Sequence, residues 1–177
     1  MAKVLEVRIS GLGGQGVVLA GVILGRAVVY DGKYAVQTQS YGAEARGSAA
    51  KSELLISDAR ISFPKVRRCD ILVAMSQSAL DKHLKDLRAT GTLLVDRDMV
   101  KEVPTIKAKV FQIPATKVAE AELGARIYAN AVMLGALTRI TRIVSKDAVE
   151  RAIVDSVPEE TRAKNLAGFE RGYVAGE

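Results

Sequence analysis

The chain has 177 residues, 49% of them hydrophobic and 26% charged, which is ordinary globular usage and is sufficient for one domain with a full core. The formal net charge of +6 favours acidic partners. The sequence has no basic stripe interleaved with aromatic residues, so nucleic-acid binding is not expected. A single cysteine, Cys69, excludes an internal disulfide and an iron–sulfur cluster held by this chain alone. We expect one domain over residues 1–177.

Nothing in the sequence indicates a membrane. No stretch approaches ~18 uninterrupted apolar residues, and the most apolar segment, residues 17–30, is interrupted by Arg26. The first residues run directly into a strand pattern, without the apolar core and cleavage site of a signal peptide. The expected location is the cytoplasm.

The first elements are a strand over residues 4–9, a glycine turn at Gly11–Gly16 and an apolar helix over residues 17–29. Gly32 suits a helix end, and residues 33–39 read as a second strand. This order predicts a βαβ unit.

In the middle of the chain, a strand is expected over residues 50–56. Residues 61–64 are either an edge strand or a loop, because Pro64 cannot donate to a central ladder. The uncharged run at residues 71–75 predicts a central parallel strand.

A helix capped by Ser76 or Ser78 is expected to run to about Arg88, with Gly91 ending it and a strand over residues 92–95. A further strand is predicted over residues 107–113.

From residue 115 onward the pattern is helical, with a break at Gly124 and later helices over residues 146–156 and 159–173. The predicted fold class is α/β: a mostly parallel sheet covered by helices on both faces, with a helical C-terminal third.

The glycine turn matches a dinucleotide-binding pattern only in part. Gly11, Gly13 and Gly16 fit G-x-G-x-x-G between a strand and a helix. The end of the second strand, Gln37–Ser40, has no carboxylate for a ribose diol, and Asp31 lies before that strand. Anion binding at the helix N-terminus and simple close packing of helix on strand both remain open.

The individual residues of the turn carry separate expectations. A Val at Gly13 or Gly14 should be destabilising if the backbone there has positive φ. Gln15 has no such backbone reason, so its replacement should affect assembly or activity more than stability.

A second polar segment, Ser40–Ser48, follows the second strand and should lie at the carboxyl edge of the sheet beside the turn. Tyr41, Glu44 and Arg46 offer a ring, a carboxylate and a guanidinium near Gly42 and Gly47, which suits recognition. An ordinary surface loop is the alternative.

Three other features are interpreted as structural. The densest basic cluster, Lys65, Arg67 and Arg68, is interpreted as a solvated face. The only histidine, His83, is expected on a helix surface, and Cys69, which precedes a buried strand, is expected to be structural despite the basic residues before it.

Four ordered motifs together resemble the gamma subunit of 2-oxoacid:ferredoxin oxidoreductases. They are Gly11–Gly16, Ser40–Gly47, Ile113–Thr116 and Asn130–Leu137. The turn beginning Gly-Leu-Gly-Gly and the Tyr-Gly segment are closer to 2-oxoglutarate-type than to pyruvate-type subunits. Because the four motifs extend from residue 11 to residue 137, the resemblance covers most of the chain.

The resemblance implies a non-catalytic subunit of a complex that oxidatively decarboxylates a 2-oxoacid, with 2-oxoglutarate favoured, to an acyl-CoA and reduces ferredoxin. It implies alpha and beta partner subunits, with delta as a further candidate, which would hold thiamine diphosphate, magnesium and iron–sulfur clusters. CoA is implied as a co-substrate of the complex. The isolated chain is expected to be inactive.

No residue is predicted to be catalytic or to bind a metal. The subunit-interface or anion-binding candidates are Gly11, Gly13, Gly14, Gln15, Gly16, Tyr41, Gly42, Glu44, Arg46 and Gly47. The alternatives are a free-standing NAD(P)-type oxidoreductase and a CoA-binding or other anion-binding module.

Overall fold

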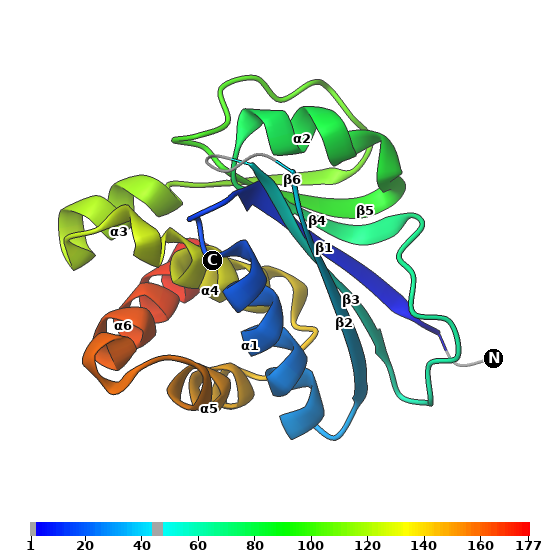
Figure 1. The fold of residues 1–177 in the computed structure, drawn as a ribbon. Helices are drawn as coiled ribbons and strands as arrows, with labels where there is room; N and C mark the ends of the chain where they lie inside the picture. The colour runs from blue at the N-terminus through cyan, green and yellow to red at the C-terminus, as the bar shows by residue number, and fades with distance from the viewer. Residues whose placement is uncertain (1–2, 44–47) are drawn as a thin grey trace.

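The computed structural model describes residues 3–43 and 48–177, and in this part the chain alternates strands and helices before ending in helices (Figure 1). The strands are β1 (Leu5–Leu12), β2 (Tyr34–Tyr41), β3 (Ala49–Ser57), β4 (Cys69–Ala74), β5 (Leu87–Asp96) and β6 (Lys109–Ile113). The α-helices are α1 (Val17–Tyr30), α2 (Gln77–His83), α3 (Ala115–Leu123), α4 (Ala129–Thr141), α5 (Lys146–Ser156) and α6 (Glu159–Ala175). Short 3₁₀ turns lie at Leu84–Asp86 and Arg126–Tyr128.

The described strands form one sheet in the order β2-β3-β1-β4-β5-β6. β1, β4, β5 and β6 pair in parallel, whereas β3 is antiparallel to both of its neighbours. The predicted mostly parallel sheet is confirmed. The simple βαβ unit is wrong in one respect: β2 follows α1 but does not pair with β1, because β3 is inserted between them.

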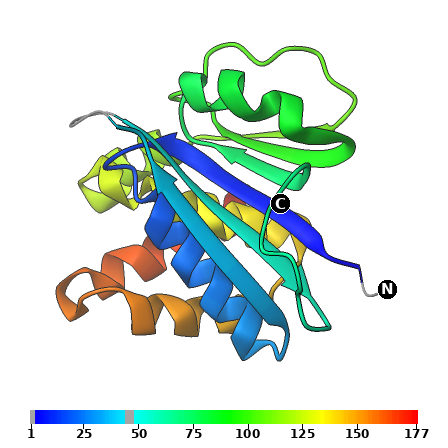
Figure 2. The same cartoon turned by 45° about the vertical axis from the view of Figure 1, so that its right-hand side comes forward.

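Helices cover both faces of the sheet, as predicted (Figures 1 and 2). On one face α1 and the C-terminal helices form the larger hydrophobic cluster, which includes Leu24, Val132 and Phe169. On the other face α2 and the loops leading into β4 and β6 cover a smaller cluster that includes Leu72 and Leu80. The alternation of strand side chains between faces accounts for the two clusters.

The two longest C-terminal helices, α4 and α6, pack against each other at glycines. A Cβ at Gly172 would lie 2.6 Å from the carbonyl carbon of Val132, and a Cβ at Gly135 would lie 2.6 Å from the amide nitrogen of Tyr173. Real Cβ atoms do not approach backbone so closely, so these glycines allow the helices to touch at their main chains.

The predicted helix to Arg88 is wrong at its C-terminal end. α2 ends at His83, a 3₁₀ turn follows, and β5 already begins at Leu87, whose side chain is buried in the smaller cluster. Gly91 therefore lies inside a strand, where an added Cβ would be 2.7 Å from the Asp70 carbonyl oxygen. The spacing of Leu80, Leu84 and Leu87 favours one face of a helix, but burial of Leu87 as a strand residue outweighs it.

Residues 61–64 belong to no helix or strand, which decides between the two expectations in favour of a loop.

Candidate functional site

The glycine turn connects the carboxyl end of β1 to the first turn of α1. Gly14 and Gly16 have φ values of +88° and +71°, in the left-handed region that only glycine adopts without cost, whereas Gly13 does not have a positive φ. The Gln15 amide donates to the Leu12 carbonyl at 3.2 Å and closes the turn. The expectation of positive φ therefore holds at Gly14 and fails at Gly13.

The side chain of Gln15 fixes this turn to the neighbouring strand. Its Oε1 accepts from the Leu12 amide at 2.7 Å, and its Nε2 donates to the Met75 carbonyl at 2.8 Å, just beyond β4. A Cβ at Gly11 would lie 2.5 Å from the same Oε1, so Gly11 leaves room for the amide. Gln15 thus has a structural role that sequence reasoning missed.

A buried asparagine supports the start of α1 from the opposite helix. Asn130, 3% exposed, donates from Nδ2 to the Gly16 carbonyl at 3.2 Å. A Cβ at Gly16 would lie 2.8 Å from Cγ of that side chain. The motif at Asn130–Leu137 is therefore physically linked to the glycine turn, a link that sequence spacing alone does not reveal.

The ends of the second polar segment lie beside the turn, as predicted. The Gly13 amide donates to the Ser48 carbonyl at 2.7 Å, and the Gly42 amide donates to the Ala49 carbonyl at 2.6 Å. Tyr41 is 62% exposed at the end of β2. The structure therefore brings Tyr41 and Gly42 to the same edge of the sheet as the glycines. Glu44, Arg46 and Gly47 lie outside the described residues.

A pocket of about 240 Å³ opens beside the turn. Its lining consists of turn residues and of side chains from other elements: Leu12, Gly13, Gly14, Gln15, Met75, Met99, Thr116, Arg126 and Ala129. Sequence reasoning did not single out Met99 or Arg126, and it named Thr116 only within a family motif. Met99 follows β5, Thr116 lies in the first turn of α3, and Arg126 follows α3, so three separate parts of the chain meet the turn in a way that sequence order does not show.

Asp96, at the carboxyl end of β5, positions the wall of this pocket. Its carboxylate is fully buried and accepts from the Thr116 hydroxyl at 2.5 Å and from the Thr116 amide at 3.4 Å. Burial raises the pKa of Asp96, although the hydrogen bonds from Thr116 oppose this. A buried aspartate directly after an apolar strand is the signal that could have identified it.

The electrostatics of the turn suit an anion but do not complete a nucleotide site. The first turn of α1 contains no acidic residue, and no side chain in the described part of the chain caps its N-terminus, so its first N–H groups point towards the turn. Gln37, near the end of the strand where a dinucleotide-binding fold carries a ribose-binding carboxylate, instead donates from Nε2 to Ser52 Oγ at 2.9 Å. Asp31 accepts from the Ser145 hydroxyl and amide, both at 2.6 Å, at the other end of α1.

A charged cluster that was not predicted is buried between the sheet and α2. Arg8 donates from Nε to Glu53 at 2.7 Å, and its Nη1 lies 2.5 Å from Asp86 and 3.3 Å from Nδ1 of His83. His83 is only 7% exposed, so the expected surface histidine is wrong. Burial, with the nearby Arg8 charge, lowers the pKa of His83 to about 4, so the ring is neutral and accepts from the guanidinium.

Cys69 is fully buried, and burial raises the pKa of its thiol to about 11, in agreement with the structural interpretation. Within residues 3–43 and 48–177, no three His, Cys, Asp or Glu side chains are grouped so that they could hold a metal ion. None of the helices described has the length and apolarity needed to cross a membrane.

These features define an α/β fold whose candidate site is the carboxyl edge of its sheet, where open α/β folds place their sites. The chain belongs to the pyruvate ferredoxin/flavodoxin oxidoreductase family, whose model matches residues 6–175. The resemblance to gamma subunits of 2-oxoacid:ferredoxin oxidoreductases is confirmed.

Individual relatives agree with this assignment. The chain is 56% identical over 171 residues to the 2-oxoglutarate synthase subunit KorC of Methanocaldococcus jannaschii, covering 95% of this chain and 91% of that one. It is 31% identical over 172 residues to the pyruvate synthase subunit PorC of the same organism, covering 96% and 95%. A crystal structure of a keto/oxoacid ferredoxin oxidoreductase gamma subunit from Geobacter sulfurreducens is similar with a TM-score of 0.87 and 44% identity, covering 97% and 98%.

Proposed function

We propose that this chain is the gamma subunit of a 2-oxoglutarate:ferredoxin oxidoreductase, which converts 2-oxoglutarate and CoA to succinyl-CoA and carbon dioxide while reducing ferredoxin. The observation that carries the choice of substrate is the contrast within one organism. Identity to the 2-oxoglutarate synthase subunit is 56%, against 31% to the pyruvate synthase subunit, over nearly the same length of chain.

The proposal assigns the chemistry to partner subunits. Alpha and beta subunits, with a delta subunit where present, would hold thiamine diphosphate, magnesium and the iron–sulfur clusters. The cofactors supply carbanion stabilisation and one-electron transfer. This chain, a single domain over residues 1–177, would be inactive alone. We infer a cytoplasmic location, because a buried, unpaired thiol does not call for an oxidising compartment.

We infer that the glycine turn and the Tyr41–Gly47 segment form a contact with the thiamine-binding subunits near the active site. Two observations support this role. Gln15, Asn130 and Ser48 hold the turn in a fixed shape. Tyr41 extends an exposed ring beside it. A rigid loop with a protruding aromatic residue is the kind of surface that anchors a protein interface.

A secondary role in holding a CoA phosphate has one specific observation in its favour. The 240 Å³ pocket is bordered by the turn before the α1 N-terminus and by exposed Arg126, whose guanidinium also pairs with Glu120 at 2.6 Å. If Arg46 contributes to that role, an assembled Arg46→Ala complex should have a raised KM for CoA. An unchanged KM would count heavily against Arg46 as a ligand.

The deciding experiment is purification of the native complex through a tag on this chain, followed by ferredoxin-reduction assays with 2-oxoglutarate, pyruvate and branched 2-oxoacids. Co-purification of larger subunits and a preference for 2-oxoglutarate are expected. A preference for pyruvate would overturn the choice of substrate. A chain that purifies alone and whose melting temperature rises with NAD(P) would support the free-standing oxidoreductase instead.

A further inference from the structure

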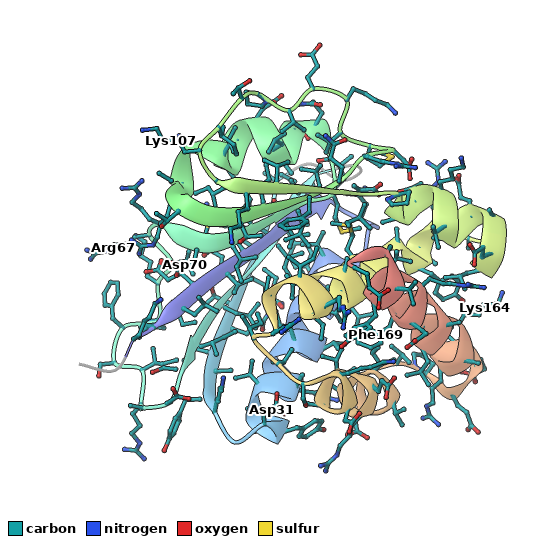
Figure 3. The ribbon with its side chains drawn as sticks, turned by 180° about the vertical axis from the view of Figure 1, so that it is seen from behind. Asp31, Arg67, Asp70, Lys107, Lys164 and Phe169 are labelled. Carbon is teal, nitrogen blue, oxygen red and sulfur yellow. The ribbon has the colours of Figure 1, made fainter. Side chains whose placement is uncertain are left out.

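The edge of the sheet opposite the glycine turn carries an exposed basic surface. Arg67 and Arg68 directly precede β4, and Lys107 lies two residues before β6, so the amino ends of these parallel strands bring the three side chains to one edge. Figure 3 shows Arg67 and Lys107 extending outward on the same side of the molecule, with Lys164 on the opposite side. We call Arg67, Arg68 and Lys107 the basic edge.

A groove of about 410 Å³ runs between two members of the basic edge. Arg68 and Lys107 are exposed at its margins, whereas buried Leu87 and half-buried Leu84 and Ile106 provide apolar surface within it. An apolar floor between exposed cations is suited to a segment that combines carboxylates with an apolar side chain.

Two carboxylates beside this edge, those of Glu6 and Asp70, are already engaged inside the fold. Glu6 Oε2 accepts from the main-chain amides of Arg67 and Arg68 at 2.9 and 3.2 Å. Arg88 forms ion pairs with both carboxylates: its Nη2 lies 3.3 Å from Glu6 Oε1, and its Nε lies 3.2 Å from Asp70 Oδ1. Glu6 and Asp70 therefore anchor the main chain and Arg88 rather than the side chains of the basic edge.

The three side chains of the basic edge remain available to a partner. Within residues 3–43 and 48–177, none of them forms an ion pair. The Arg67 guanidinium lies 5.0 Å from the ring centroid of Phe63, which is itself 56% exposed. Stacking on the ring orients the guanidinium while its N–H groups stay free to bind.

We propose that the basic edge and its groove dock an acidic segment of a neighbouring subunit of the oxidoreductase, with an apolar side chain of that segment entering between Leu84 and Ile106. The surface is separate from the glycine-turn contact, so this subunit would join two parts of the assembly. The partner rests on the proposed function. A nucleic acid fits less well, because the groove offers apolar surface where a polyphosphate backbone needs cations.

The first test uses carbodiimide cross-linking of the native complex, which joins a lysine amine directly to a carboxylate. Mass spectrometry should show Lys107 joined to an Asp or Glu of another subunit, whereas exposed Lys117 and Lys164 should give no such product. Cross-links from Lys117 and Lys164 but none from Lys107 would overturn the proposal.

The second test measures assembly of the chain with its partner subunits at several salt concentrations. Arg68→Glu/Lys107→Glu should weaken binding by at least tenfold and flatten its salt dependence, whereas the charge-matched control Lys117→Glu/Lys164→Glu should stay within about twofold of the unmodified chain. Circular dichroism would verify that both variants fold. Equal binding by the two variants would overturn the docking site.

Other occupants give different results in the same experiment. If the unmodified chain alone is a dimer that only Arg68→Glu/Lys107→Glu dissociates, the groove binds a second copy and the proposal is wrong. Binding of a single-stranded oligonucleotide that only this variant loses would likewise assign the edge to nucleic acid. If the unmodified chain joins no larger subunit, the proposed function fails with the docking site. If it joins them and Arg68→Glu/Lys107→Glu binds them as tightly as the unmodified chain does, only the docking site fails.

Discussion

Alanine substitutions at Gly13, Gly14 and Gly16 should separate three physical effects within one turn. Gly13 does not have a positive φ, and an added Cβ would be 3.5 Å from the Ser48 carbonyl oxygen, an ordinary contact. Gly14 has φ +88°, and no atom of residues 3–43 or 48–177 lies within 4 Å of an added Cβ. Gly16 has φ +71°, and its Cβ would meet the Asn130 side chain.

The magnitudes follow from these geometries. Gly13→Ala should change the free energy of unfolding by less than about 1 kcal/mol, because it mainly reduces the entropy of the unfolded chain. Gly14→Ala adds about 1–2 kcal/mol of left-handed strain, which that entropy gain offsets in part, leaving a net loss near 1 kcal/mol. Gly16→Ala also displaces the buried Asn130 amide from the Gly16 carbonyl, which adds about 1–3 kcal/mol.

Urea unfolding of the purified chain, followed by circular dichroism, measures the series. A loss of about 1 kcal/mol lowers the melting temperature by roughly 2–4 °C in a domain of this size, so a thermal scan provides an independent reading. The expected order of stability is Gly13→Ala, then Gly14→Ala, then Gly16→Ala as the least stable. A Gly14→Ala variant as stable as Gly13→Ala would refute the strain argument, and a Gly16→Ala variant no worse than Gly14→Ala would refute the clash with Asn130.

Three further predictions concern the interior. Gly172→Ala should cost about 2–3 kcal/mol in urea unfolding, because its Cβ would lie 2.6 Å from the Val132 carbonyl carbon and the two helices would have to separate; an unchanged midpoint would contradict the close approach. Arg8→Met should cost roughly 3–5 kcal/mol by leaving Glu53 buried with only the half-buried Lys51 as a partner, and Arg8→Met/Glu53→Leu should recover much of that loss; a double variant less stable than the single one would exclude this explanation. The pKa of His83 is about 4 in the folded chain, against 6.5 for an ordinary histidine. Between these pH values only the unfolded chain takes up the proton. The free energy of unfolding should therefore fall by on the order of 3 kcal/mol as the pH drops from above 6.5 towards 4. His83→Gln should lose that part of the pH dependence, and a variant with an unchanged slope over this interval would show that other groups cause it.

Much of the fold was predictable, because its elements carry local signals. The apolar run at residues 71–75 indicated a central strand, and β4 is flanked by parallel partners on both sides. The insertion of β3 between β2 and β1 was not predictable, since strand order depends on tertiary packing rather than on the spacing of apolar residues.

The candidate site was predictable in its glycines but not in its supports. Gly11–Gly16 and the segment beginning at Tyr41 could be placed at one edge, because both follow strands that run in the same direction. The role of Gln15 required knowing that the end of β4 lies beside the turn, and the role of Asn130 required knowing how α4 meets α1. His83 was misplaced because the fold buries it against Arg8, a residue 75 positions away in the sequence.

The antiparallel insertion of β3 makes the two sequence motifs neighbours in a single row of the sheet. Ala50 pairs with Gly11 of β1 on one side and with Tyr41 of β2 on the other, so only this one residue of β3 separates the two motifs across the sheet. A one-residue deletion within β3 would shift both ladders together and turn the remaining side chains to the opposite face, whereas lengthening the α1–β2 connection would leave the row intact. In a comparison of related chains, insertions should therefore accumulate after α1 and be rare within β3.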